Sequence, residues 1–233
     1  MPSFSVIIPA YQEEKAIQRA IAETARVFQG LGVDFEIIVV DDGSRDRTSE
    51  MALRGVDGLK SVRLLRHPDN QGKGSAIRTG VASAEKDWIV FLDADLATHP
   101  SDIRHALPHV SETDLLIGSR SHPDSAIELQ QPAYRVFSGQ LFNLLGVRMY
   151  LGLPYKDTQC GFKLFRRELV PLVRGLQTDG WVFDVELIAR ARQAGFRIRE
   201  IPVTWRHGRE TRVKLSDAGR ILRDLAYIKK QRR

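Results

Sequence analysis

Five short runs of apolar residues, separated by predicted helices, constrain the fold of this chain more than any other feature. The runs cover residues 4–9, 35–40, 61–65, 88–92 and 115–118, and the helices between them are predicted at 14–29, 46–54, 74–84 and 101–110. Strands that are apolar along their whole length are buried on both faces, as in parallel sheets. The sequence therefore predicts an α/β fold with a mostly parallel sheet and helices on both of its faces.

The second half of the chain has a less regular pattern. Residues 123–131 are predicted to form a polar loop, and residues 132–151 form an apolar stretch with polar interruptions. Further strands are expected at 162–165 and 198–204, and further helices at 182–194 and 217–230, the last with Ser216 as its N-cap. No stretch has the composition of a linker, so we expect a single domain over residues 1–233.

Polar residues gather where the predicted strands end. The clusters are Pro9-Ala-Tyr-Gln-Glu13, Asp41-Asp-Gly-Ser44, Asn70-Gln-Gly-Lys-Gly74, Asp93-Ala-Asp95 and Gly118-Ser-Arg120. The carboxyl ends of parallel strands meet at one edge of an open sheet, and such sheets bind their ligands at that edge. Five clusters in register favour a ligand site over five unrelated turns.

Asp93 and Asp95 are two residues apart at a strand end, so their side chains leave the chain on the same side. Two carboxylates in this position suit a hard divalent cation such as Mg²⁺ or Mn²⁺, which in turn binds a diphosphate. A pair of turn-forming or helix-capping aspartates is the alternative. The other clusters favour the metal.

Asp41 and Lys73 are further candidates for ligand contacts. An aspartate at the end of a strand can accept hydrogen bonds from a base or ribose, although Asp-Gly-Ser also suits a turn. Gly72 and Gly74 flank Lys73 at a predicted helix start, where a phosphate can approach the backbone beside one positive charge. An ordinary helix start is the simpler interpretation of these glycines.

The net charge of +6 is concentrated at the C-terminus, where residues 204–233 hold ten basic and three acidic residues. Such a tail suits an anionic partner: a membrane surface, a phosphate or a nucleic acid. A basic nucleic-acid-binding protein is the rival function from a different class, which salt-dependent retention on DNA or RNA would test; we find no nucleic-acid-binding module and expect no nucleic-acid partner. The single cysteine, and the lack of a transmembrane-length apolar run or a signal peptide, favour a cytoplasmic location.

Several motifs carry a resemblance to a known family. Val6-Ile-Ile-Pro-Ala-Tyr-Gln-Glu13, Val39-Val-Asp-Asp-Gly-Ser44 and Phe91-Leu-Asp-Ala-Asp95 together resemble the inverting family-2 glycosyltransferases, which have the GT-A fold. Asp157-Thr-Gln-Cys-Gly-Phe-Lys-Leu-Phe165 and Trp181-Val-Phe-Asp-Val-Glu-Leu187 are similar to the polyprenyl-phosphate hexosyltransferases, and within them to the dolichyl-phosphate β-glucosyltransferase branch. The similarity covers nearly the whole chain.

The resemblance implies a role for each matching residue. The nucleoside would contact Pro9, Ala10, Tyr11, Glu13 and Asp41. Lys73 would lie near the base or diphosphate, and Arg120 would approach the phosphates. Asp93 and Asp95 would bind the metal, Mg²⁺ or Mn²⁺, and the ribose-diphosphate. The acceptor phosphate would meet Arg135, Lys163, Arg209 and Lys214. Residues 1–120 would form the nucleotide-sugar half, 121–215 the acceptor half and 216–233 a basic amphipathic tail.

Two departures from the family pattern refine this expectation. Related mannosyltransferases carry a glutamine as an added metal ligand where Ala97 stands here, which favours UDP-glucose over GDP-mannose as donor. Many members also have carboxyl-terminal membrane spans, and this sequence has none. We therefore expect peripheral attachment to the cytoplasmic face of a membrane, or attachment through a membrane-bound partner subunit. A homo-oligomer is the alternative partner.

The expected reaction is the inverting transfer of a hexose from a UDP-hexose to a polyprenyl phosphate. Asp184 occupies roughly the position of a general base in relatives that glycosylate hydroxyl groups; it would serve as a base, orient the acceptor or cap the following helix. The apolar residues of 132–151 and the tail face of Ile221, Leu222, Leu225 and Ile228 suit a membrane interface, or else core packing or a dimer contact. The rival function within the family is transfer from GDP-mannose.

Overall fold

The computed structural model describes residues 2–56, 58–129, 139, 141–206 and 218–231. Its main feature is a seven-stranded sheet in the order β3-β2-β1-β4-β7-β5-β8. The strands are β1 Phe4–Ala10, β2 Phe35–Asp41, β3 Val62–Arg66, β4 Trp88–Leu92, β5 Leu115–Gly118, β7 Phe162–Arg166 and β8 Ile198–Ile201. Only β7 runs antiparallel to its neighbours in this sheet. The prediction of a mostly parallel sheet is confirmed.

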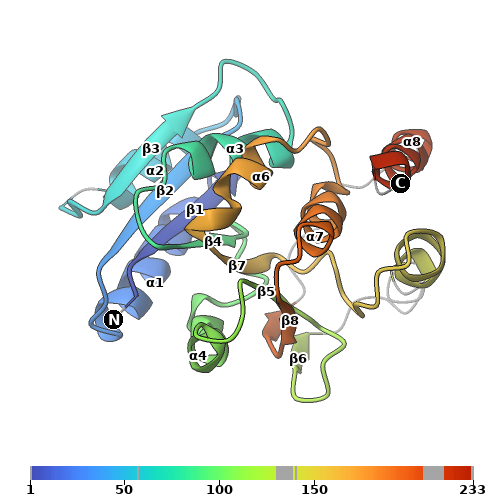
Figure 1. The fold of residues 1–233 in the computed structure, drawn as a ribbon. Helices are drawn as coiled ribbons and strands as arrows, with labels where there is room; N and C mark the ends of the chain where they lie inside the picture. Colours follow the sequence, from blue (N-terminus) through green and yellow to red (C-terminus); the bar gives the residue numbers. More distant parts are fainter. Residues whose placement is uncertain (1, 57, 130–138, 140, 207–217, 232–233) are drawn as a thin grey trace.

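Helices cover both faces of this sheet (Figure 1). The elements are α1 Ile17–Gly30, α2 Thr48–Val56, α3 Lys73–Ala82, α4 Ile103–Ala106 between the 3₁₀ turns η1 Pro100–Asp102 and η2 Leu107–His109, the π-helix η3 Asn143–Tyr150, the 3₁₀ turn η4 Arg167–Leu169, α6 Val170–Arg174, α7 Phe183–Gln193 and α8 Ala218–Gln231. No described helix is long and apolar enough to cross a bilayer.

The alternation of side chains along the strands divides the core into two layers. Ile7, Ile38 and Phe91 face one layer, in which they pack with residues of α3, α6, α7 and α8. Val6 and Ile37, their neighbours in sequence, face the other layer, which contains residues of α1, α2 and α4. Because successive side chains of a strand point to opposite faces, a strand without polar positions can serve both layers.

Three predicted elements differ in the structure. The expected loop at 123–131 contains β6 Ala126–Leu129, which pairs with β9 Thr204–Arg206 in a two-stranded sheet. The strand expected at 198–204 is divided into β8 and β9, and Pro202 lies between them without an N–H for a ladder. The helix expected at 101–110 is broken into η1, α4 and η2, the last containing Pro108.

Candidate active site

The loops that follow β1 and β2 are tied to each other by hydrogen bonds. The backbone N–H of Gln12 donates to Ser44 Oγ at 2.9 Å, and that of Glu13 donates to Thr48 Oγ1 at 2.7 Å. Gln12 has a φ of 55°, a left-handed conformation that non-glycine residues seldom adopt. An open hollow of about 490 Å³ lies beside these loops, lined by Gln12, Glu14, Lys15, Arg45 and Asp46.

Asp41 and Asp42 end β2, and both carboxylates are bound by the protein itself. The Asp41 side chain is fully buried; Oδ1 accepts from the backbone N–H of Ser44 at 3.0 Å, and Oδ2 accepts from the hydroxyl of Ser49. The structure therefore does not present Asp41 directly to a nucleoside. Its carboxylate instead closes the loop to which Gln12 and Glu13 are bound.

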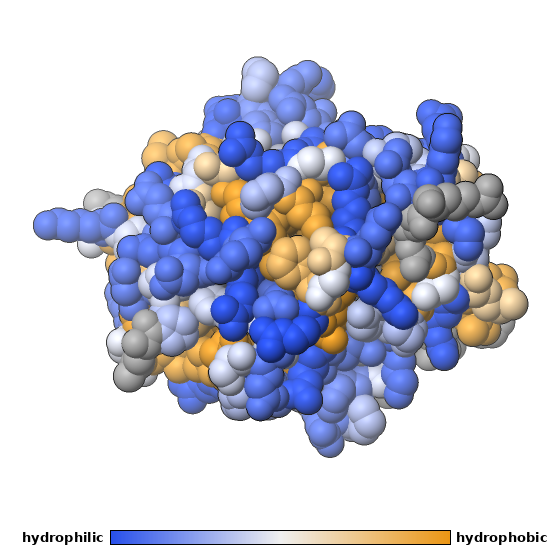
Figure 2. Space-filling view, viewed as in Figure 1, coloured by the Kyte–Doolittle hydropathy of each residue, from blue (hydrophilic) through white to orange (hydrophobic). Residues whose placement is uncertain are grey.

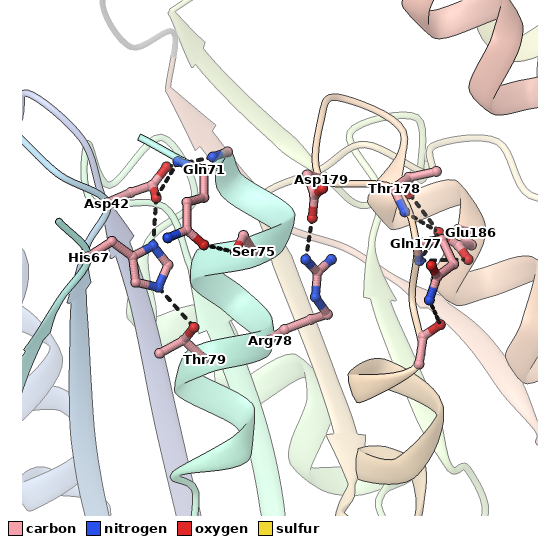
Figure 3. Close-up of polar contacts among 12 residues, drawn as sticks. Asp42, His67, Gln71, Ser75, Arg78, Thr79, Gln177, Thr178, Asp179 and Glu186 are labelled. Carbon is pink, nitrogen blue, oxygen red and sulfur yellow. Dashed lines mark hydrogen bonds and ion pairs between the residues drawn. The ribbon is translucent and has the colours of Figure 1, made fainter. Parts of the chain in front are cut away.

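Asp42 fixes the segment that leads into α3. Its Oδ1 accepts from the backbone N–H of Gln71 at 2.9 Å, and its Oδ2 accepts from that of Gly72 at 2.8 Å. Nδ1 of His67 lies 2.7 Å from Asp42 Oδ1, and Nε2 lies 2.9 Å from Thr79 Oγ1 on α3 (Figure 3). The sequence offered no signal that separates this anchoring aspartate from its neighbour.

The glycines around Lys73 let protein backbone, rather than a phosphate, approach the start of α3. A Cβ on Gly72, which has a φ of 97°, would lie 2.5 Å from the carbonyl oxygen of Asp179. A Cβ on Gly74 would lie 2.6 Å from the carbonyl oxygen of Thr178, and the Gly74 N–H donates to Asp179 O at 3.0 Å. The segment before α7 thus lies directly against the N-terminus of α3.

Two polar contacts hold that segment in place (Figure 3). Arg78 on α3 forms an ion pair with Asp179. Glu186 on α7 is buried; its Oε2 accepts from the Thr178 N–H at 2.8 Å and from the Thr178 hydroxyl at 2.7 Å. Arg190 lies 2.6 Å from Glu186 Oε1 and balances its charge. Residues 178–179 therefore connect α3, which begins with Lys73, to α7, which carries Asp184.

Lys73 forms an ion pair with Asp93, with 2.5 Å between Nζ and Oδ1. Burial alone would lower the pKa of Lys73, but the carboxylates of Asp93, Asp184 and Asp95 outweigh it and raise that pKa. The ammonium therefore stays charged. Gly161 makes room for Asp93, because a Cβ on this glycine would lie 2.0 Å from Asp93 Oδ2.

Asp95 is the exposed member of the expected metal-binding pair. Its Oδ1 accepts from the backbone N–H of Ala97 at 2.9 Å, which fixes the turn after β4. No group of three or more metal-ligating side chains occurs among the described residues. Asp95 with Asp93 fits a cation such as Mg²⁺ that takes one or two protein carboxylates and completes its shell with phosphate oxygens and water.

Asp184 lies beside this pair and is buried against Lys163. Lys163 Nζ is 2.9 Å from Asp184 Oδ1, in an orientation that does not make a hydrogen bond. Burial raises the pKa of Asp184, while the ammonium groups of Lys163 and Lys73 act in the opposite direction. The N-cap residue of α7 is Val182 and Asp184 lies within the first turn, so Asp184 is not the residue that caps this helix.

The expectation that Lys163 meets the acceptor phosphate needs correction. Its side chain is fully buried in β7, and Nζ donates to the carbonyl oxygens of Thr158 at 2.8 Å and Cys160 at 2.5 Å. A lysine without solvent access cannot contact a phosphate from solution unless the surrounding chain moves. Lys163 instead neutralises Asp184 and fixes the 158–160 turn.

Arg120 pairs with Asp157 through two side-chain hydrogen bonds. Nε donates to Asp157 Oδ2 at 2.6 Å and Nη2 donates to Oδ1 at 2.9 Å, while the guanidinium lies over the ring of Trp205 at 5.6 Å. Burial opposes the charge of Asp157, but Arg120 outweighs this and lowers the pKa of that carboxyl. The pair joins two motifs that are far apart in the sequence.

Three residues expected to bind the acceptor phosphate, Arg135, Arg209 and Lys214, lie outside the described residues. The structure does bring together the strand ends that carry Pro9, Ala10, Asp93 and Arg120. The structure also places Gly161, Asp179 and Glu186 in the site. The sequence did not indicate these residues, because their contacts arise from packing between distant segments.

Comparison with known proteins decides the family. The family model for Glycosyl transferase family 2 matches residues 5–171. The chain belongs to glycosyltransferase family 2. A dolichyl-phosphate β-glucosyltransferase of Trichomonas vaginalis, ALG5C, is 33% identical to this glycosyltransferase over 238 residues, which cover 95% of the chain and 69% of ALG5C. Glycosyltransferase AglD of Haloferax volcanii is 35% identical over 216 residues, which cover 91% of the chain but 34% of AglD.

Solved structures show which fold the chain has. Glucosyl-3-phosphoglycerate synthase of Mycobacterium tuberculosis, in a complex with Mn²⁺, UDP and glucosyl-3-phosphoglycerate, matches with a TM-score of 0.72 at 23% identity. The match covers 99% of this glycosyltransferase and 80% of that chain. The likeness shows that the glycosyltransferase has the GT-A fold, as the sequence motifs had indicated.

Proposed function

We propose that this glycosyltransferase transfers glucose from UDP-glucose to a polyprenyl phosphate such as dolichyl phosphate, with inversion at the anomeric carbon and with a divalent cation. The observation that carries the proposal is the group of Lys73, Asp93 and Asp95 at the carboxyl ends of the sheet, in a chain related to dolichyl-phosphate β-glucosyltransferases. Residues 1–120 would hold the donor, residues 121–215 the acceptor, and the reaction would take place at a membrane surface.

The donor side of the site suits a nucleoside diphosphate. The tied loops of Pro9–Glu13 and Asp41–Thr48 would enclose the nucleoside, with Ala10, Tyr11 and Glu13 as its contacts. Lys73 would neutralise one charge of the diphosphate, since its ammonium stays protonated. Arg120 would approach the phosphates from the other side, held by Asp157. UDP in the related synthase structure and the Ala97 position support uridine over guanosine.

A divalent cation, Mg²⁺ or Mn²⁺, would be held by Asp95 together with Asp93. When bound, it would neutralise charge that develops on the departing diphosphate. Both ions accompany UDP in structures of the synthase. Asp93 has a second task, because it also holds Lys73.

The acceptor requires little activation. A phosphomonoester has its second pKa near 6, so it is largely a dianion at neutral pH. One of its oxygens would attack C1 of glucose, the bond between C1 and the UDP oxygen would break, and UDP would leave with the bonding electrons. Positioning and charge neutralisation then supply most of the catalysis. Asp184, with its charge balanced by Lys163, would help to orient the acceptor. It would not serve as a general base, because a base is needed only when the acceptor is a hydroxyl group.

Proton NMR of the purified lipid product tests the reaction and its stereochemistry together. UDP-glucose is an α-glycoside, so the proposal expects a β-linked glucosyl phosphate, with a large coupling constant for the anomeric proton. An α-linked product would refute inversion. If label from GDP-mannose entered the lipid faster than label from UDP-glucose, the donor sugar would be mannose and not glucose.

A further inference from the structure

Exposed hydrophobic side chains gather on one part of the surface. Of the eight large hydrophobic residues found exposed among the described residues, six lie on or beside η3 and α8: Leu141, Leu144, Leu145, Met149, Tyr150 and Leu222. Met149 and Leu222 are the most exposed, at 69% and 68%. Figure 2 shows hydrophobic atoms at the right-hand edge of the molecule, where Figure 1 places the π-helix η3 near α8. We call these six residues the apolar platform.

The platform has a firm base in the core. Val147 of η3 and Leu225 and Ile228 of α8 are buried in the same hydrophobic cluster. A methyl group of Leu225 would lie 3.3 Å from a Cβ on Gly146, and Lys229 Nζ donates to the carbonyl oxygen of Tyr150 at 2.5 Å. The expected interfacial face of α8 is wrong for Leu225 and Ile228, which pack inward, whereas Leu222 is exposed and its membrane contact stays a prediction.

The charges around the platform have mostly one sign. Arg148 on η3 and Arg220, Arg223 and Lys230 on α8 are exposed. Asp224 is the single acidic residue in the described parts of these two helices. An apolar surface with a basic rim is complementary to an anionic lipid bilayer, which accepts hydrophobic side chains below a negatively charged headgroup layer.

The platform adjoins the candidate active site. Arg220 lies against Gly180, where an added Cβ would be 3.5 Å from the guanidinium Nε. Gly180 follows Asp179, which is paired with Arg78 of α3, and precedes α7 with Asp184. A surface that docks at the platform would therefore lie next to the segment that joins Lys73 to Asp184.

We propose that the apolar platform of η3 and α8 docks this glycosyltransferase on an anionic lipid bilayer. Leu144, Leu145 and Met149 enter the acyl region, and the basic rim binds the lipid headgroups. This docking extends the proposed function and rests on one part of it, namely that a membrane lipid carries the acceptor phosphate. The docking itself requires no substrate and can be measured alone.

Flotation with lipid vesicles tests the docking. Wild-type protein should float with vesicles of phosphatidylcholine and phosphatidylglycerol at low salt, less at high salt, and weakly with phosphatidylcholine alone. The triple variant Leu144→Ser/Leu145→Ser/Met149→Ser should lose binding on the order of tenfold. Leu53→Ser is the matched control, because Leu53 is 59% exposed on α2, outside the platform. Circular dichroism melts should show that both variants are folded.

Three results would overturn the docking proposal. The first is a folded triple variant that floats as well as wild type. The second is wild type that ignores anionic vesicles at low salt. The third is a wild-type dimer in light scattering that the triple variant lacks, without vesicle binding by either protein, since the platform would then bind a second copy.

A parallel assay separates docking from catalysis. With a short-chain polyprenyl phosphate dispersed in detergent, the triple variant should transfer glucose at nearly the wild-type rate. With acceptor in anionic vesicles, its rate should fall along with its binding. Wild type that floats but glycosylates no lipid phosphate would contradict the proposed function and leave the docking intact.

Discussion

Lys73 and Asp93 form an ion pair between the start of α3 and the end of β4, with 2.5 Å between Nζ and Oδ1. The pair lies between two other carboxylates, Asp95 and Asp184, which also raise the pKa of Lys73. Because the charge of Lys73 is secured by its surroundings, the residue is suited to bind an anion over the whole neutral pH range.

Replacement of Lys73 tests this role. Lys73→Gln keeps a hydrogen-bond donor but removes the charge, so kcat/KM for UDP-glucose should fall on the order of a hundredfold. Lys73→Arg should retain part of the activity. Steady-state kinetics with varied UDP-glucose provides the measurement, and unchanged kcat/KM in the glutamine variant would show that Lys73 has no part in donor binding or transfer.

Gly161→Ala should displace Asp93 without unfolding the protein. The added Cβ would meet Asp93 Oδ2 at 2.0 Å, and the carboxylate can escape only by turning away from its present position. Activity should fall on the order of a hundredfold because a group in the site is misplaced. Gly30→Ala is the control, since no atom lies within 4 Å of a Cβ there. Equal activity of the two variants would argue against a required Asp93 position.

Glu186→Gln should loosen residues 177–178 and destabilise the fold. The buried carboxylate accepts hydrogen bonds from the backbone N–H groups of Gln177 and Thr178. In the variant, the amide nitrogen would face one of these N–H donors, and the positive charge of Arg190 would lose its carboxylate partner. We expect a loss of about 3 kcal/mol in the free energy of unfolding. Glu50→Gln, on the exposed face of α2, should cost much less, because solvent screens its ion pairs. Urea unfolding of both variants provides the comparison.

Asp102 predicts a pH dependence of stability. It is buried and accepts from the Thr204 N–H at 2.9 Å, and burial raises the pKa of Asp102 to about 6 from its ordinary 3.8. Between these values the folded state holds a proton that the unfolded state has lost. The contribution of Asp102 to stability is therefore present below pH 3.8 and is lost as the pH rises to about 6.

Asp102→Asn removes this pH dependence and keeps an oxygen for Thr204. The variant should gain stability relative to wild type as the pH rises from about 4 to 7, by about 2–3 kcal/mol in total. Urea unfolding at both pH values measures the difference. A difference between variant and wild type that does not change with pH would contradict the raised pKa.

The first half of the fold could be predicted because its strands are continuous apolar runs and its helices are amphipathic. The observed bounds of β1, β2, β3, β4 and β5 differ by one residue at most from those expected at each end. The antiparallel position of β7 between β4 and β5 could not be predicted, because an apolar run such as 162–165 does not encode the direction in which it pairs.

The candidate site could be predicted only in part for a related reason. Asp93, Asp95 and Arg120 come one to three residues after a strand, and Lys73 begins the helix that follows β3, so sequence position alone indicates their common edge. The contact of Gly161 with Asp93 depends on the register of β4 with β7, and the contact of Gly74 with Asp179 depends on how α7 packs against α3. Asp41 and Lys163 are buried and bind other parts of the protein instead of a ligand. Their burial could not be predicted, because both are charged residues of the kind usually found at the surface.

The most direct test of the central claim is the amount of radiolabelled glucose that passes from UDP-glucose into the organic phase when dolichyl phosphate and Mg²⁺ are added. We predict acceptor-dependent transfer by wild type, abolished by excess chelator, and loss on the order of a thousandfold in a folded Asp95→Asn variant. Organic-phase label that does not depend on dolichyl phosphate, or full transfer by Asp95→Asn, would contradict the account.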